Sequence, residues 1–167
     1  MASRIEHRAR FSEPPSVVYS ALIAEAYLQA RLAALGGTGA LLLEHDITGV
    51  PATYHIRHGV PSDKLPSAAR SLLGGDLIVD RRERWQADAG EYRNTIEAII
   101  PGMPGEIQAR MRLGRSADDD SELHTTGEVK IGVPVLGGKL ERTIAEQVTA
   151  LLIAEMDFTE KWLTTAR

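Results

Sequence analysis

Residues 132–163 read GVPVLGGKLERTIAEQVTALLIAEMDFTEKWL, a turn-rich segment followed by a helical pattern. In a helix, side chains three and four positions apart lie on one face, so apolar residues at that spacing mark a buried stripe. The pattern predicts a helix over residues 140–162, long enough to cross a small domain. Its apolar stripe consists of Leu140, Ile144, Val148, Leu151, Phe158 and Trp162.

Glu155 lies near the middle of this apolar stripe. Burying an isolated charge is costly, so a carboxylate at that position is either paired with a cation or has a raised pKa. Two interpretations follow. Glu155 forms a structural ion pair, or it lies in a ligand cavity and orients the polar end of a ligand.

The segment before the helix looks like a phosphate-binding loop but lacks two of its parts. The Walker A pattern is GxxxxGK[ST], and the spacing from Gly132 to Lys139 is one residue too long for it. Leu140 follows the lysine and has no hydroxyl for magnesium. We therefore expect the glycines to form a hinge that ends the last strand and directs the helix, with Lys139 in solvent.

Upstream of this segment, apolar and polar residues alternate in runs separated by short breaks. Alternation predicts half-buried strands, and breaks too short to hold crossover helices predict antiparallel pairing. The expected strands are residues 4–11, 41–47, 52–58, 77–87, 92–100, 107–113 and 123–133.

Two short helices, residues 15–24 and 25–35, are expected after the first strand, because SEPPS can start a helix and a Gly-Gly pair can end one. An insertion at residues 61–75 should hold a short helix near residues 67–73, and whether it acts as a lid stays open. The fold class is α+β: a single domain over residues 1–167, with a seven-stranded curved antiparallel sheet wrapped on the long C-terminal helix. A helix is narrower than the sheet it covers, so a cavity is expected between them.

The composition excludes several functional classes. The net charge is −4 and gives no basic face for nucleic acid. The sequence has no cysteine, which excludes disulfides, thiolate metal sites and cysteine nucleophiles. The charged first residues predict no signal peptide, and no apolar run approaches the roughly 18 residues of a membrane span. We expect a cytoplasmic protein that binds no nucleic acid and does not insert stably into a membrane.

The stretch FSEPPSVVYSALIA at residues 11–24, which follows the opening strand, and above all the segment 132–163 resemble the START-like (SRPBCC) helix-grip superfamily. That superfamily includes plant pathogenesis-related proteins, polyketide cyclases and lipid-transfer domains. The insertion KLPSAARSLLGGDLIV at residues 64–79, followed by Arg84-Trp85, resembles an uncharacterised actinobacterial branch related to polyketide cyclase and lipid-transport proteins. The resemblance covers nearly the whole chain.

This resemblance implies that the protein binds or transports a small hydrophobic or amphipathic molecule in the cavity between sheet and helix. A homodimer is possible. No catalytic signature of the cyclases matches this sequence residue by residue, so no catalytic residue is assigned and no cofactor is expected.

Strand alternation places candidate ligand-binding residues on the inner face of the sheet. If Trp85 points inward, Arg81 does too and is a candidate cation partner for Glu155, although a β-bulge would reverse the assignment. Ordinary core filling is the alternative role for Trp85, whereas Asn94 needs a partner in protein, water or ligand. The candidate lining is His7, His45, Tyr54, Arg81, Trp85, Asn94, Val148, Leu151, Leu152 and Glu155.

Metal binding is a weaker interpretation of the polar residues. Alternation puts His7, His45 and His58 on inner faces, but no HxxxH or HExxH spacing occurs, and core or cavity histidines with hydrogen bonds explain them better. The acidic run at residues 118–120 lacks the spacing of a calcium loop and is interpreted as a hairpin tip. No metal is predicted.

Three functions stay open at this point. A carrier would hold a ligand in the cavity, and an enzyme resembling a polyketide cyclase or dehydratase would use Glu155 or a histidine there as a general base. A protein-interaction module would have a filled cavity and bind a partner through an exposed edge strand or the insertion. A cavity too small for a few carbon atoms would favour the interaction module.

Overall fold

The structure is a computed structural model that describes residues 2–65, 67, 70–71, 74–117 and 120–165. Its helices are α1 (Pro15–Leu22), α2 (Glu25–Leu35) and α4 (Gly137–Thr165), with a short 3-10 helix η1 (Ser62–Lys64). Its strands are β1 (Ser3–Phe11), β2 (Leu41–Asp46), β3 (Ala52–Val60), β4 (Leu77–Asp88), β5 (Glu91–Ile99), β6 (Gly105–Arg115) and β7 (Ser121–Ile131).

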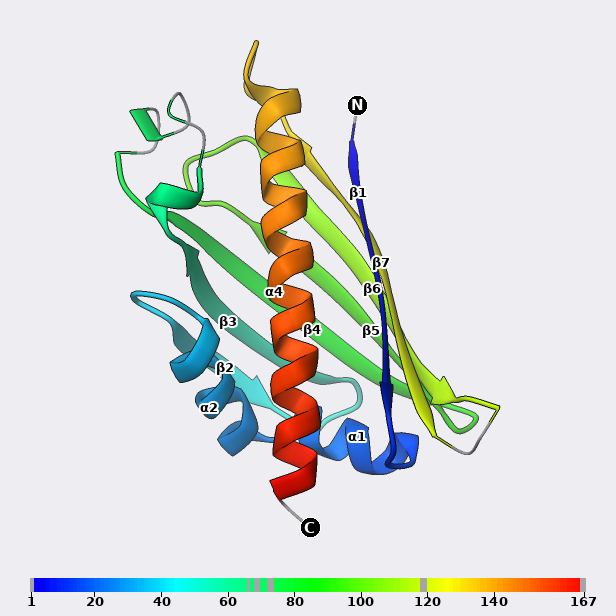
Figure 1. The fold of residues 1–167 in the computed structure, drawn as a ribbon. Helices are drawn as coiled ribbons and strands as arrows, with labels where there is room; N and C mark the ends of the chain where they lie inside the picture. The colour runs from blue at the N-terminus through cyan, green and yellow to red at the C-terminus, as the bar shows by residue number, and fades with distance from the viewer. Residues whose placement is uncertain (1, 66, 68–69, 72–73, 118–119, 166–167) are drawn as a thin grey trace.

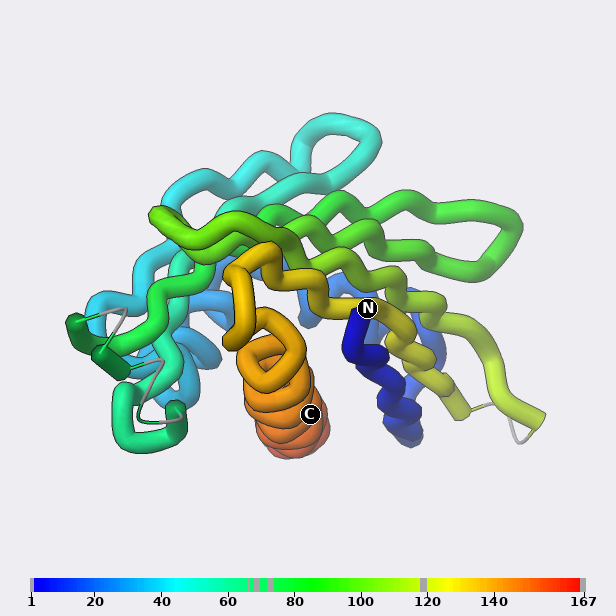
Figure 2. The backbone as a smooth tube through the Cα atoms, turned by 90° about the horizontal axis from the view of Figure 1, so that it is seen from above, coloured from blue at the N-terminus to red at the C-terminus, as the bar shows by residue number. Residues whose placement is uncertain are grey.

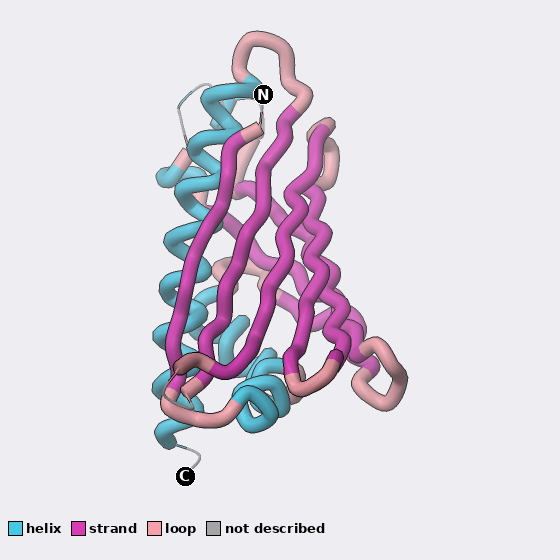
Figure 3. The backbone as a smooth tube through the Cα atoms, turned by 90° about the vertical axis from the view of Figure 1, so that its right-hand side faces the viewer, coloured by secondary structure: helices cyan, strands magenta, loops and turns pink. Residues whose placement is uncertain are grey.

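The strands form one seven-stranded antiparallel sheet in the order β1-β7-β6-β5-β4-β3-β2. Figure 1 shows α4 lying across this sheet, and Figure 2 shows the sheet arching over the helix, which therefore occupies the concave side. The helices α1 and α2 lie together at the end of the sheet reached by the C-terminal half of α4 (Figure 3). The predicted fold class, element order and antiparallel pairing are confirmed.

The strands and helices form where the sequence periods predict them, with small changes at their ends. The two-residue turn between β4 and β5 falls at Ala89 and Gly90, both of which have positive φ as tight hairpins require. The helix predicted near residues 67–73 falls in a stretch of which the structure describes only residues 67, 70 and 71, and residues 118–119 of the acidic run also lie outside the described residues. None of the described helices is both long and apolar enough to cross a membrane.

The period of two in the sequence predicts one inner face formed by Leu41, Leu43, His45 and Ile47, and this prediction is wrong for every one of them except His45. The pairing of β2 with β3 shifts register between Leu42 and Glu44, so a bulge at Leu43 reverses the alternation. Leu42 then pairs with the buried Ile56, whereas Leu41 is 52% exposed and Leu43 is 37% exposed. His45 still faces inward, because the bulge moves it opposite Tyr54.

The buried face of α4 is wider than the predicted stripe. Leu140 and Ile144 are buried as expected, but further along the helix Leu152, Met156, Thr159 and Leu163 are more deeply buried than Phe158 and Trp162. The reason is that two elements cover this half of the helix. The ring of Tyr27 on α2 lies 5.9 Å from the Phe158 ring and 5.7 Å from the Trp162 ring.

The junction between β7 and α4 fixes where the helix starts. The carboxylate of Glu141 accepts a hydrogen bond of 2.9 Å from the backbone N–H of Ile131, the last residue of β7. A Cβ on Gly137 would lie 2.7 Å from the Ile131 carbonyl oxygen, so only glycine fits there. The left-handed residue of the turn is Val135, with φ of 69°, and not one of the glycines predicted to form the hinge. Lys139 is exposed, as expected.

Candidate functional site

Four charged side chains meet in the interior, between the sheet and the helices. Glu155 of α4, which is 3% exposed, lies between Arg31 of α2 and Arg81 of β4. Arg81 Nη1 donates to both Glu155 oxygens at 3.2 Å, and Arg31 Nε is 3.4 Å from Glu155 Oε2. Arg81 Nε is also 2.7 Å from Glu83 Oε2, an ion-pair contact without hydrogen-bond geometry. We call Arg31, Arg81, Glu83 and Glu155 the charged cluster.

Strand alternation positions the β4 members of the cluster. Leu77, Val79, Arg81, Glu83 and Trp85 are buried, whereas the residues between them point to the convex face. The prediction that Arg81 would turn inward and meet Glu155 is therefore confirmed by the ion pair. Of the two interpretations of Glu155, the ion pair therefore describes the contacts that this carboxylate makes.

Three uncharged polar side chains extend the cluster across the sheet. The Tyr54 hydroxyl donates to Glu83 Oε1 at 2.9 Å, and Asn94 Nδ2 donates to the same oxygen at 2.5 Å. Trp85 Nε1 donates to the Tyr54 hydroxyl at 3.2 Å. Each of these side chains is buried, and each fixes the orientation of the next.

The cluster keeps its charges in spite of burial. Burial alone would raise the pKa of Glu155, but the charges of Arg31 and Arg81 outweigh it and the pKa lies below its ordinary value. Burial alone would lower the pKa of Arg81. The negative charges of Glu155 and Glu83 outweigh this effect and raise the pKa above its ordinary value. The two arginines and two glutamates therefore balance to zero net charge.

His58 on β3 lies beside the cluster and is uncharged at neutral pH. Burial, and after it the positive charge of Arg81, lowers the pKa of His58 from 6.5 to about 4. The side chain is 6% exposed, and neither ring nitrogen has a hydrogen-bond partner in the part of the chain that the structure describes. A neutral imidazole with two unused ring nitrogens offers one donor and one acceptor.

A small hollow lies under α4 next to His58 and Arg81. Its volume is about 40 Å³, and most of its lining is apolar and comes from β1, β4, β5, β6 and α4. The helix contributes Val148, Leu151 and Leu152. A volume of this size holds roughly three water molecules or a few carbon atoms.

Other buried polar atoms, in the charged cluster and in the network that extends it, also lack partners. Arg31 Nη2 and Asn94 Oδ1 make no hydrogen bond with any residue that the structure describes. Buried polar groups are satisfied in the large majority of folded proteins. The interior therefore has unused capacity for both donors and acceptors.

The predicted lining residues fall into three groups. Arg81, Val148, Leu151 and Leu152 line the hollow, whereas Tyr54, Trp85, Asn94 and Glu155 belong to the polar network beside it. His45 is hydrogen-bonded elsewhere: its Nε2 lies 2.7 Å from the carbonyl oxygen of Ile23, just after α1. His7 is half-buried on the edge strand β1 and does not line the hollow. Whether any of them binds a ligand is a proposal that is made below.

Sequence reasoning missed Arg31, Glu83 and His58 as members of the site. Arg31 follows Tyr27 by four residues and Leu28 by three, so it shares their helix face, and this spacing could have indicated its burial. Alternation places His58 on an inner face, and it places Glu83 on the same face as Arg81 and Trp85, but the part of both residues in the network depends on packing that alternation does not show. No group of three His, Asp or Glu side chains within the described ranges is arranged to hold a metal ion.

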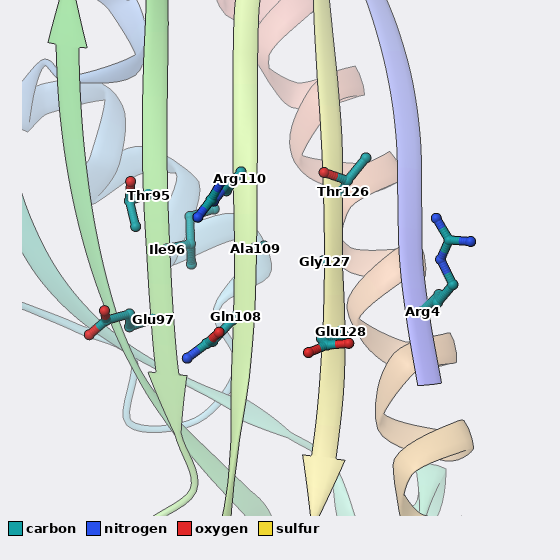
Figure 4. Close-up of a pocket in the computed structure, with 10 residues that line it drawn as sticks. All are labelled: Arg4, Thr95, Ile96, Glu97, Gln108, Ala109, Arg110, Thr126, Gly127 and Glu128. Carbon is teal, nitrogen blue, oxygen red and sulfur yellow. The ribbon is translucent and has the colours of Figure 1, made fainter. Parts of the chain in front are cut away.

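A second hollow lies on the convex face, on the opposite side of the sheet from α4 (Figure 4). Its volume is about 420 Å³, and its side chains stand in two cross-strand rows, one of Thr95, Arg110 and Thr126 and one of Glu97, Gln108, Glu128 and Arg4. The rows carry two arginines and two glutamates, whose side chains are in contact with solvent. Exposed charges of both signs are typical of a solvated sheet face, so we place the candidate site in the interior.

Comparisons with known proteins agree with this architecture. An uncharacterized protein of Mycobacterium tuberculosis is 31% identical over 107 residues, which is 63% of this chain and 62% of the relative. The match thus spans less than two thirds of the relative's length. A protein from Thermus thermophilus superposes with a TM-score of 0.66 at 12% identity, covering 98% of this chain and 99% of that one.

Two further solved structures share the fold and have informative names. The Zhui aromatase/cyclase from a Streptomyces species has a TM-score of 0.63 at 13% identity, covering 98% of this chain and 94% of its own. A START superfamily protein from Mycobacterium smegmatis has a TM-score of 0.55 at 14% identity, covering 98% and 99%. At these identities the likeness shows the fold alone.

A family model described as "Protein of unknown function (DUF2505)" matches residues 6–163. The sheet curved around α4, with two short helices after β1, is the arrangement of the START-like neighbours. The chain therefore belongs to the DUF2505 family and has the START-like helix-grip fold.

Proposed function

We propose that the protein binds a small amphipathic molecule between the sheet and α4, with the polar end of the ligand at the charged cluster and His58. The observation that supports this most directly is a set of buried, unpartnered polar atoms beside an apolar hollow. The START-like fold of the chain is consistent with a ligand in this place. The protein is proposed to act in the cytoplasm, without nucleic acid.

Stability alone does not account for the charged cluster. Removing charges from water costs several kcal/mol per ion, and replacing buried ion pairs with apolar residues is often neutral or stabilising. A protein that needed only a stable core could place apolar side chains at the positions of Arg31 and Glu155. Buried polar groups without hydrogen-bond partners are expected in a ligand site, where the ligand supplies the missing hydrogen bonds.

The volume of the hollow limits what the protein can bind without moving. Pockets for small molecules commonly measure about 300–1,000 Å³, whereas this hollow measures about 40 Å³. A ligand of ordinary size therefore requires α4 to move away from the sheet, or the side chains of Val148, Leu151 and Leu152 to change rotamer. We interpret the structure as a closed form of the carrier.

An enzyme that uses Glu155 as a general base has less support. The pKa of Glu155 lies below its ordinary value because two arginines outweigh the effect of burial, and a carboxylate so stabilised is a weak base. His58 is the remaining acid–base group beside the hollow, and its pKa of about 4 makes it a weak base too. Binding is thus better supported than a reaction of the cyclase or dehydratase kind.

A protein-interaction module is the second candidate, and the outer side of β2 favours it. β2 is an edge strand, and Leu41 and Leu43 on it and Ile47 just after it are exposed. An apolar edge strand can pair with another chain, including a second copy in a homodimer. If this is the function, Leu43→Lys should abolish self-association in sedimentation experiments, whereas a monomeric wild type would exclude the homodimer.

The carrier proposal can be tested with N-phenyl-1-naphthylamine, an uncharged probe whose fluorescence rises in apolar surroundings. We expect saturable binding by the wild-type protein. Ala98 lines the hollow, so Ala98→Leu should fill it and weaken binding about tenfold, the effect of adding methylenes to a packed interior. Ile99→Leu on the exposed side of the same strand is the control and should change nothing. Absence of saturable binding, or equal affinity in Ala98→Leu, would rule out this site.

A further inference from the structure

His58 stands at the boundary between the charged cluster and the apolar hollow, and it is a buried polar side chain that the protein leaves without a partner. Both ring nitrogens are buried, and neither makes a hydrogen bond with any residue in the described part of the chain. The ring is one of the few polar groups of the hollow, together with Arg81 and Thr125. Arg81 is already engaged by Glu155 and Glu83, which leaves His58 free to contact a ligand.

The charge balance of the interior restricts which ligand can meet His58. Two arginines and two glutamates already compensate one another. An added carboxylate or ammonium group would leave one buried charge uncompensated, and the cost of burying an unpaired charge is large. An uncharged group meets no such cost.

The hydrogen-bonding pattern restricts the ligand further. A neutral imidazole presents one N–H donor and one bare nitrogen acceptor, so its complement is a group that both accepts and donates. A hydroxyl or a primary amide does both, whereas an ester or an ether only accepts. The remaining lining of the hollow, which includes Ala98, Ile107 and Leu151, suits a hydrocarbon chain or ring.

We propose that the ligand class is a neutral amphipathic molecule with a hydroxyl or primary amide end, and that His58 is the residue that recognises this end. This inference rests on the proposed function. It assigns to His58 a specificity role: the balanced charged cluster leaves the charge of an ionised ligand uncompensated, and the imidazole selects among neutral ligands.

The test uses three probes with the same chain length and different ends: octan-1-ol, octanoate and octylammonium. The affinity of each probe is measured at pH 7 by its displacement of N-phenyl-1-naphthylamine from the wild-type protein. We expect octan-1-ol to bind at least about tenfold more tightly than either charged probe, because only the charged probes bury an unpaired charge. His58→Phe keeps the ring volume, and it should weaken octan-1-ol binding about three- to tenfold, the net value of one hydrogen bond.

Two controls separate the possible results. His55→Phe changes the neighbouring histidine of β3, which does not line the hollow, and should leave all three affinities unchanged. In the wild type, the ring nitrogen resonances of His58 should move on adding octan-1-ol, a measurement that needs no variant. If the naphthylamine probe binds but octanoate or octylammonium binds as tightly as octan-1-ol, or His58→Phe binds octan-1-ol as tightly as the wild type does, this inference is wrong and the carrier proposal stands. If neither the naphthylamine probe nor the three chain probes bind, both are wrong.

Discussion

Glu155 connects the long helix to the rest of the interior through two arginines from different elements. Arg31 reaches it from α2 and Arg81 from β4, and both pairs are almost fully buried. Removing the carboxylate charge would leave two guanidinium groups with only Glu83 to balance them. The stability of the fold therefore depends on this one charge.

Glu155→Gln preserves the side-chain shape and removes the charge. We expect it to lower the free energy of unfolding by about 3–5 kcal/mol, the usual cost of breaking a buried ion pair from one side. Urea denaturation measures this loss, and Glu160→Gln on the exposed face of the same helix should change stability by less than about 0.5 kcal/mol. Adding Arg31→Met to Glu155→Gln should restore part of the loss. A change below about 1 kcal/mol in Glu155→Gln would show that the cluster is not charged.

His58 should make stability depend on pH in mildly acidic solution. Its pKa falls from 6.5 in the unfolded chain to about 4 in the folded protein. The unfolded state therefore binds more protons between these values, and stability falls as pH decreases from 6.5 to about 4. The full loss is on the order of 3 kcal/mol relative to His58→Phe, which cannot titrate.

Urea denaturation of the wild type and His58→Phe at pH 7 and pH 4.5 measures this difference, because the contributions of the carboxylates are shared by both proteins. The charges of Arg31 and Arg81 lower the pKa of Glu155 in spite of its burial, which opposes its protonation over this pH range in both proteins. Parallel pH profiles of the two proteins would contradict the burial of a neutral His58.

At the scale of single residues, the sequence predicts a site where a charged residue occupies a position that the strand or helix period assigns to an apolar one. Arg81 and Glu155 both interrupt such a period, and their pairing could be predicted from it. Arg31 also interrupts an apolar period. Its partner could not be predicted, because residue spacing within α2 does not show that α2 packs against α4. The unpartnered nitrogens of His58 depend on the packing of every neighbour, so no pattern indicates them.

At the scale of elements, the junction between β7 and α4 determines where the helix places Glu155. Gly137 packs against the Ile131 carbonyl oxygen, and Glu141 accepts the Ile131 N–H one helical turn later. The helix was predicted to begin at residue 140 because the glycines before it were interpreted as a hinge, but the helix begins at Gly137, where the close approach of the backbones favours glycine.

Substitution of the two adjacent glycines separates packing from helix propensity. Gly137→Ala puts a Cβ 2.7 Å from the Ile131 oxygen and should destabilise the protein by about 1–3 kcal/mol. Gly138→Ala meets no atom within 4 Å and should be neutral or stabilise it by up to about 1 kcal/mol. Thermal unfolding of both variants provides the comparison, and equal melting temperatures would show that the junction is not tightly packed.

The strands were predictable as elements because one face of the sheet is buried and the other is solvated, which imposes a period of two. The exception is β2, where three consecutive leucines make the inner face ambiguous and the bulge at Leu43 decides it. A bulge arises from pairing with β3, so the isolated run could not indicate it.

At the scale of the whole molecule, the order of elements was predictable and the size of the hollow was not. A cavity is expected wherever one helix covers a wide curved sheet, but its volume is what remains after every side chain has packed. Here α4 and the charged cluster leave about 40 Å³. The proposed ligand can therefore bind only if α4 or the side chains that line the hollow move to enlarge it.

The most direct test of this account is the location of bound octan-1-ol by nuclear Overhauser effects in the methyl-labelled protein. We predict contacts from the octyl chain to the methyl groups of Val148, Leu151 and Leu152, which line the hollow. Contacts confined to the convex face, beside Thr95 and Thr126, or the absence of any contact at saturating alcohol, would contradict ligand binding beneath α4.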